Sequence, residues 1–253
     1  MRRASTLGLA LPLLLACSHP PPTVADQESP QCRMVADQAL AALGEVLPSD
    51  DPWKEIANDP AKVTQALDAL GSYPIPDRTA TSVFDRALKN GGIADADVPK
   101  FFEAKGCSVI RFFRAWKITL ASLKHYKISG AEKERARARL AHYLQTMPEA
   151  PSLIEVLVRI QLAEWGVESG LFRPSKPTVK KLADLRTRAT NDKNKIRLAW
   201  KKLEALERPE DYETWTDAEK TLVKQTLFDE LSTVQSLADE LSGTARDLAR
   251  NPA

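Results

Sequence analysis

Two glutamates near residue 168 have the type and spacing that acid–base chemistry uses. Glu164 and Glu168 are four residues apart in the segment AEWGVESGLFRP, residues 163–174, so they share one face of a helix. A glutamic acid can protonate a departing oxygen when apolar surroundings raise its pKa toward neutrality, and a neighbouring carboxylate raises it further. Trp165 and Phe172 are apolar residues of the same segment. Glu168 is therefore the catalytic candidate in this sequence.

The letters ESG that begin at Glu168 resemble the catalytic-glutamate motif of lytic transglycosylases, which cleave peptidoglycan. The resemblance implies that Glu168 would act as general acid on a glycosidic oxygen. It covers about ten of the 253 residues, and residues 176–188 read KPTVKKLADLRTR where the family has a Gly-Leu-Met-Gln-like segment. The same letters have a structural alternative. In it, Gly170 takes the left-handed conformation that ends a helix, and Leu171 makes the accompanying apolar contact.

The chain begins MRRASTLGLALPLLLAC, which has the parts of a secretory leader. Arg2 and Arg3 precede an apolar core that is shorter than the ~20 residues needed to span a bilayer. The ending LLAC resembles the lipobox of bacterial lipoproteins, with an ordinary leader and a chance cysteine as the alternative. The resemblance implies cleavage before Cys17 and acylation of its thiol and amino group with chains such as palmitate. More than one chain holds a protein stably at a membrane, and Ser18 in that family favours the outer membrane, facing the periplasm.

The rest of the chain divides into three parts after the leader at residues 1–16. Residues 17–31 carry the acylated cysteine and a proline-rich tether, which is semi-rigid where prolines cluster. We expect a helical domain over residues 32–174 and an antiparallel helical hairpin over residues 175–253. No run has the period-two pattern of a strand, so the predicted class is all-α.

Residues that typically begin a helix recur through the predicted helical domain and hairpin. Two Asp-Pro pairs place an N-cap before a first-turn proline, at Asp51 and Asp59. Three segments match the capping box: Ser129–Glu132, Ser152–Glu155 and Thr216–Glu219. The clearest helix covers residues 107–127, where six apolar residues recur three and four apart: Val109, Phe112, Phe113, Trp116, Leu120 and Leu123. We expect it to be the central packing element of the domain.

The predicted hairpin has two apolar seams and segregated charge. The first seam is Leu182, Leu185, Ala189, Asp192, Ile196, Ala199, Leu203 and Leu206; the second is Leu227, Leu231, Val234, Ala238, Leu241, Ala245 and Leu248. Such spacing predicts coiled-coil-like packing. Residues 176–208 carry a net charge of +7 and residues 210–253 a net charge of −6. Opposite charges favour pairing of the two helices, and binding of an anionic partner such as lipid headgroups or acidic glycans is the alternative role for the basic helix.

The remaining residues that could do chemistry are few. Cys32 and Cys107 form an even pair in an oxidising compartment, which predicts a disulfide, with two buried free thiols as the alternative. The three histidines, His19, His125 and His142, are not spaced for a shared metal. The sequence contains no Gly-rich phosphate loop, GxSxG elbow or HExxH motif. We therefore expect no metal and no cofactor.

The net charge and the predicted location of the protein limit the functions that it can have. The leader takes Arg2 and Arg3 with it, so the 36 Lys and Arg fall to 34, equal to the Asp and Glu. A neutral chain argues against nucleic acid as a partner. We expect a membrane-anchored envelope lipoprotein that acts as a non-catalytic scaffold or adaptor with an envelope protein partner. The alternatives are the transglycosylase-like enzyme that uses Glu168 and a carrier of an apolar or lipid ligand near Phe112, Phe113 and Trp116.

Overall fold

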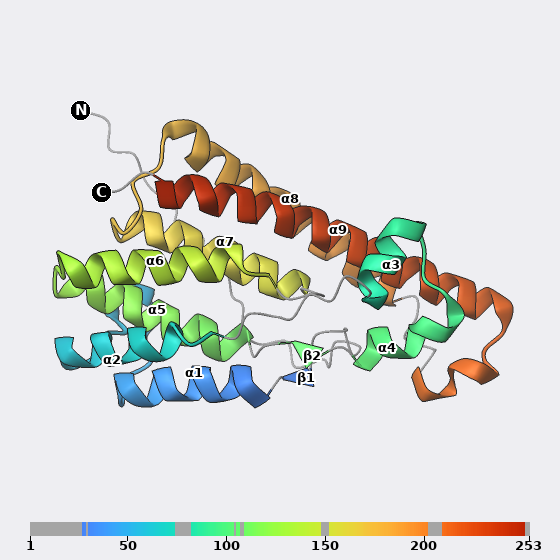
Figure 1. Ribbon diagram of the computed structural model, residues 1–253, viewed down its shortest axis with the longest axis horizontal. Coiled ribbons are helices and arrows are strands. Elements are labelled where there is room, and N and C mark those ends of the chain that lie inside the picture. The colour runs from blue at the N-terminus through green and yellow to red at the C-terminus, as the bar shows by residue number, and fades with distance from the viewer. Residues whose placement is uncertain are drawn as a thin grey trace.

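The computed structural model describes residues 27–28, 30–73, 82–103, 105–106, 109–147, 152–201 and 209–250 (Figure 1). Its α-helices are α1 (Pro30–Leu43), α2 (Pro60–Leu70), α3 (Val83–Asn90), α4 (Val98–Glu103), α5 (Val109–His125), α6 (Ala131–Gln145), α7 (Leu153–Glu168), α8 (Lys176–Lys201) and α9 (Asp217–Arg250). Three short 3-10 helices are η1 (Pro52–Lys54), η2 (Asp95–Asp97) and η3 (Pro209–Thr214). The predicted all-α class is confirmed.

One short strand pair departs from that prediction. β1 (Gln27–Glu28) and β2 (Lys105–Gly106) pair in parallel, with Gln27 opposite Lys105 and Glu28 opposite Gly106. A two-residue bridge is held by backbone hydrogen bonds and needs no alternating side-chain pattern, so the sequence carries no signal for it. The pairing joins the starts of α1 and α5, which also pack against each other.

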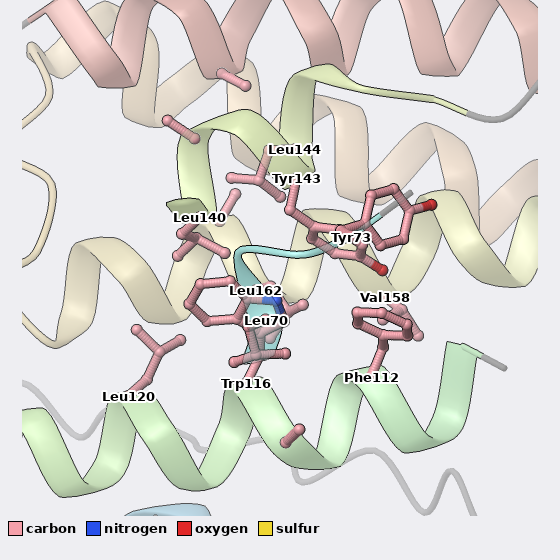
Figure 2. Close-up of a cluster of buried hydrophobic side chains, with 14 of the residues drawn as sticks. Leu70, Tyr73, Phe112, Trp116, Leu120, Leu140, Tyr143, Leu144, Val158 and Leu162 are labelled. Atoms are coloured by element: carbon pink, nitrogen blue, oxygen red, sulfur yellow. The ribbon is translucent and has the colours of Figure 1, made fainter. Parts of the chain in front are cut away.

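The helix α5 is the centre of the larger core, as its periodicity predicts. Four of the six residues that carry this periodicity are buried: Phe112, Trp116, Leu120 and Leu123. Figure 2 shows the first three facing Leu140, Tyr143 and Leu144 of α6, with Leu70 and Tyr73 beside them. Phe113 lies at the edge of this core and is only partly buried. The helix also packs on α1, α2, α7 and η1, so it organises the shorter helices around it.

Most of the predicted caps are present. Four of the five predicted side chains accept a backbone N–H at a helix start: Asp51, Asp59, Ser152 and Thr216. The capping box predicted at Ser129–Glu132 is wrong. The helix α6 begins after Gly130, whose φ is +66°, and no side chain caps it. A glycine in that conformation turns the chain into the helix and moves the serine out of the cap position.

A second, smaller core lies beside the first half of α9. It gathers residues of α3, the loop after α3, α4, η3 and α9: Phe84, Ala87, Ile93, Val98, Phe101, Tyr212, Val223, Leu227 and Leu231. The helix α9 has 34 residues, about 51 Å at 1.5 Å per residue, so it runs along both cores. Ile196 of α8 contacts both. One long helix thus joins the two packed regions (Figure 1).

The helices α8 and α9 lie side by side along the upper edge of the molecule in Figure 1. Arg188 pairs with Glu240 and Lys181 with Asp247, so residue numbers rise along α8 as they fall along α9. The helix α9 also packs on α6 and α7, and α8 packs on α7. The apolar seam of α9 is therefore shared between α8 and the helices below it.

Candidate functional site

Glu168 is the last residue of α7 and is exposed to solvent. The backbone after it closes the helix end. Gly170, with φ +73°, donates its N–H to the carbonyl of Val167 at 3.0 Å, and Leu171 donates to that of Gly166 at 2.9 Å. These two bonds and the burial of Leu171 form a Schellman motif. The predicted left-handed cap at Gly170 is confirmed, and it accounts for the letters ESGL without a catalytic role.

Burial alters the electrostatics of the Glu164 carboxylate. Burial raises the pKa of Glu164, Arg186 of α8 opposes that rise, and the charge of Glu168 adds to it. Arg186 Nη1 donates to Glu164 Oε2 at 2.8 Å. This ion pair connects α7 to α8, so the carboxylate is engaged in packing two helices together.

The apolar residues expected around Glu168 are packed into the body instead. The Trp165 ring lies 5.1 Å from Phe113 and 6.2 Å from Trp53, and Lys124 Nζ lies 4.0 Å from the Trp53 ring. Phe172 is buried. Trp165 thus ties α7 to α5 and η1, and the helix end does not form the apolar wall that a general acid needs.

A buried ionic centre around Arg159 was not predicted. The Arg159 guanidinium is 0% exposed and the Glu155 carboxylate 2% exposed. Arg159 donates through Nε and Nη2 to Glu155 Oε1, at 3.1 and 2.6 Å. Its Nη2 also donates to the Tyr73 hydroxyl at 2.8 Å, and its Nη1 donates to the carbonyls of Tyr143 and Thr146. All five N–H donors of the guanidinium therefore have an acceptor.

This centre holds three chain segments together. Tyr143 and Thr146 lie at the end of α6, where carbonyls lack helical partners and a cation is favourable. Glu155 lies in the first turn of α7, where an anion is favourable. The guanidinium carbon is 3.9 Å from the Tyr143 ring, and burial raises the pKa of Tyr73 to about 12 although Arg159 lowers it. The only sequence signal was a Glu and an Arg four residues apart, which surface helices also show.

Many exposed charged side chains lie on the surface formed by α8 and α9. A groove of about 520 Å³ lies along α9 beside α8. Its walls carry the cations Lys181, Arg246 and Arg250 and the carboxylates of Glu240 and Asp247. Lys181 and Arg250 each lie 3.9 Å from Asp247, and Arg188 pairs with Glu240. The groove is polar and its charges largely offset one another.

The outer face of α8 is cationic. Nine Lys and Arg stand against two Asp along this helix. Four exposed cations form no ion pair within the described part of the chain: Lys176, Lys180, Arg197 and Lys201. On a helical wheel the four residues occupy a sector of about 100°, on the side opposite the buried Leu182, Leu185 and Ala189. We call these four residues the α8 cationic face and take it as the candidate functional surface.

The cysteine predictions fall largely outside the described residues. Cys17 and Cys107 lie outside them, and Cys32 is placed only by its backbone in α1. The segments next to the predicted pair do lie together. β1 pairs with β2 just before the two positions, and Asp37 of α1 pairs with Arg111 of α5 just after them. The disulfide between Cys32 and Cys107 stays a prediction that this arrangement favours.

The histidines take part in local contacts. His125 and His142 are exposed on α5 and α6, and His142 Nδ1 lies 3.4 Å from Thr146 Oγ1; His19 lies outside the described residues. Among the described residues, no group of three or more His, Cys, Asp or Glu could hold a metal ion. In that same part of the chain, no helix combines the length and apolar character needed to cross a membrane.

The space around Phe112 and Trp116, where an apolar ligand was considered, is filled by aromatic rings. Phe112 lies 5.1 Å from Tyr73 and 5.7 Å from Tyr143, and Trp116 lies 6.4 Å from Tyr143 (Figure 2). Phe112 and Trp116 are each fully buried. This packing argues against the carrier alternative at that position.

Comparison with known proteins gives no relative from which a role could be transferred. No protein-family model matches the chain, and no curated protein or solved structure resembles it at a significant level.

Proposed function

We propose that this protein is a lipoprotein of the bacterial cell envelope that acts by binding, as a scaffold or adaptor in an envelope complex. The observation that carries the proposal is the leader, whose apolar core ends in LLAC directly before a proline-rich tether. Acyl chains on Cys17 would hold the body at the membrane, with Ser18 favouring the outer membrane and a body that faces the periplasm. An envelope protein is the expected partner.

The helical body supports a binding role. We propose that residues 175–253 form an antiparallel hairpin whose outer surfaces are available to partners. The opposed ion pairs of α8 and α9 fit that arrangement. Shared packing of α9 with α6 and α7 would hold the hairpin rigidly on the body. A rigid, charged surface suits a protein that positions others.

The anchor predicts where a cysteine variant is found. In a Gram-negative host, we expect the protein to sediment with membranes and to incorporate labelled palmitate. The variant Cys17→Ser should lose the label and leave the membrane fraction, because no acylated residue remains to hold it. Cys32→Ser is the matched control and should stay membrane-bound. A Cys17→Ser protein that still sediments with membranes and carries the label would contradict the anchor.

A non-catalytic role makes a second prediction at Glu168. The purified protein should release no soluble sugar fragments from peptidoglycan, and Glu168→Gln should behave as the wild type in that assay. Both should unfold at similar temperatures, because the exposed Glu168 side chain makes no contact that closes the helix end. Chromatography of the supernatant provides the measurement. Sugar release by the wild type that Glu168→Gln abolishes would establish the transglycosylase-like enzyme instead.

A further inference from the structure

We propose that the α8 cationic face docks peptidoglycan, the anionic glycan–peptide polymer of the cell wall. The inference rests on the proposed envelope function and names the chemistry of one partner. Peptide stems of peptidoglycan carry free carboxylates at intervals along a glycan strand. The four residues of the face, Lys176, Lys180, Arg197 and Lys201, offer exposed ammonium and guanidinium groups. Charge complementarity between the two is the first argument.

The other cations of α8 show why these four differ. Of these five other cations, four form an ion pair with a carboxylate of α7, α8 or α9: Lys181, Arg186, Arg188 and Lys195. The fifth, Lys193, is only partly exposed. Three of these pairs join two helices and one lies within a single turn, and in each pair the two opposite charges offset one another. Asp184 is the one exposed carboxylate on the described α8. The outer face therefore keeps a net positive charge that the fold itself does not neutralise.

The spacing of the four cations suits a linear polymer better than a small anion. They form two pairs at opposite ends of the helix, with Lys180 and Arg197 about 25 Å apart along the axis. Uncharged polar residues lie between them on the same face: Thr187, Thr190, Asn191 and Asn194. A strand with carboxylates at intervals can reach both ends, whereas one small anion cannot.

The neighbouring helix limits where the polymer can lie. Three exposed carboxylates of α9 form no ion pair among the described residues: Asp217, Asp229 and Asp239. Like charges repel an anionic strand, so α9 would keep it along α8. The polar groove beside Lys181 has nearly balanced charge and would not compete strongly for an anion. One helix of the pair thus attracts the polymer and the other confines it.

The first described elements after the tether lie far from the α8 cationic face. Nine residues, 18–26, lie between Cys17 and β1, and the ten steps from Cys17 to Gln27 cover at most about 35 Å. β1 and α1 lie at the lower edge of Figure 1, while α8 lies at the upper edge, beyond α5 and α7. The α8 cationic face therefore lies on the side of the body opposite the edge at which the described chain begins.

The proposal is tested by co-sedimentation of the full-length protein, purified in mild detergent, with isolated peptidoglycan sacculi. We expect binding at low ionic strength that weakens steadily as salt is added, because exposed charges are screened. The triple variant Lys180→Glu, Arg197→Glu, Lys201→Glu should bind at least about tenfold more weakly, since each exposed pair contributes modestly and three attractions become repulsions. Amidation of the sacculus carboxylates should weaken binding of the wild type in the same way.

The matched control reverses three exposed cations elsewhere on the body, with Lys54→Glu, Lys89→Glu and Arg114→Glu. It makes the same change in net charge and should bind sacculi as the wild type does. Thermal unfolding of both triple variants reports whether they are folded. Equal sedimentation of the α8 variant and the wild type, or equal losses in the two triple variants, would overturn the proposal.

A lipid surface is the competing anionic partner, and a separate measurement distinguishes it. The unacylated Cys17→Ser protein is mixed with phosphatidylglycerol vesicles and floated. We expect little recovery with the vesicles while binding to sacculi persists. Vesicle binding through the α8 cationic face without sacculus binding would assign the face to lipid and overturn the proposal. Failure of membrane anchoring in cells would leave the sacculus result unchanged, so the two proposals fail separately.

Discussion

Replacing Arg159 with methionine is expected to lower the free energy of unfolding by about 3–5 kcal/mol. The change leaves the Glu155 carboxylate, which is 2% exposed, without its cation in the protein interior. It also removes the donors to the Tyr73 hydroxyl and to the carbonyls at the end of α6. Buried polar groups without partners carry the full cost of desolvation. Chemical denaturation followed by circular dichroism measures the loss.

Two further variants separate the ion pair from the packing of the side chain. The double variant Arg159→Met, Glu155→Leu should recover part of the lost stability, because it leaves no unpaired buried charge. Arg188→Met breaks the exposed pair with Glu240 and should cost less than about 1 kcal/mol. A similar small loss in Arg159→Met would show that water reaches the centre and that the charges are not truly buried.

The second large effect is expected at Gly166, in the last turns of α7. Alanine normally stabilises a helix relative to glycine by about 1 kcal/mol. A Cβ at Gly166 would lie 2.6 Å from Phe172 Cδ2 and 3.2 Å from Leu140 Cδ2. Phe172 is buried and has little room to move. We therefore expect Gly166→Ala to destabilise the protein by about 1–3 kcal/mol, as overpacking of a core does.

The chain provides its own control in Gly243, a glycine of the helix α9. A Cβ there would meet nothing closer than Arg246 Nη2 at 3.9 Å. Gly243→Ala should therefore stabilise the protein by about 0.5–1 kcal/mol through helix propensity alone. Denaturation midpoints of the two variants should move in opposite directions. Stabilisation in both would mean that Phe172 does not pack against Gly166.

Much of the local structure could be predicted from the sequence. Asp59 and Ser152 cap helices because their oxygens satisfy backbone amides within the next three residues, a contact decided by neighbours in the chain. The apolar spacing along α5 identified its buried residues for the same reason. Gly130 shows the limit, because its left-handed backbone displaced the cap predicted at Ser129.

The candidate site depended on contacts that the sequence does not encode locally. Glu168 was the catalytic candidate by sequence, yet burial and Arg186 act on Glu164 while Glu168 stays in solvent. Which of two residues on a helix face is covered depends on the helix that packs there. The α8 cationic face has the same origin. The sequence shows that α8 is basic along its whole length. Carboxylates of α7 and α9 pair with other cations of α8 and leave the four residues of the face without an ion pair.

The sequence alone determined that this protein is helical, where many of its helices begin and end, and that opposite charges separate into its last two long helices. Those properties follow from hydrogen bonds and periodicities that span a few residues. Only the tertiary structure decided that Arg159 and Glu155 meet Tyr73 in the interior and that Phe172 lies against Gly166. Segments distant in the chain determine which side chains are buried. Burial in turn determines how much a charge or a methyl group changes the free energy of unfolding.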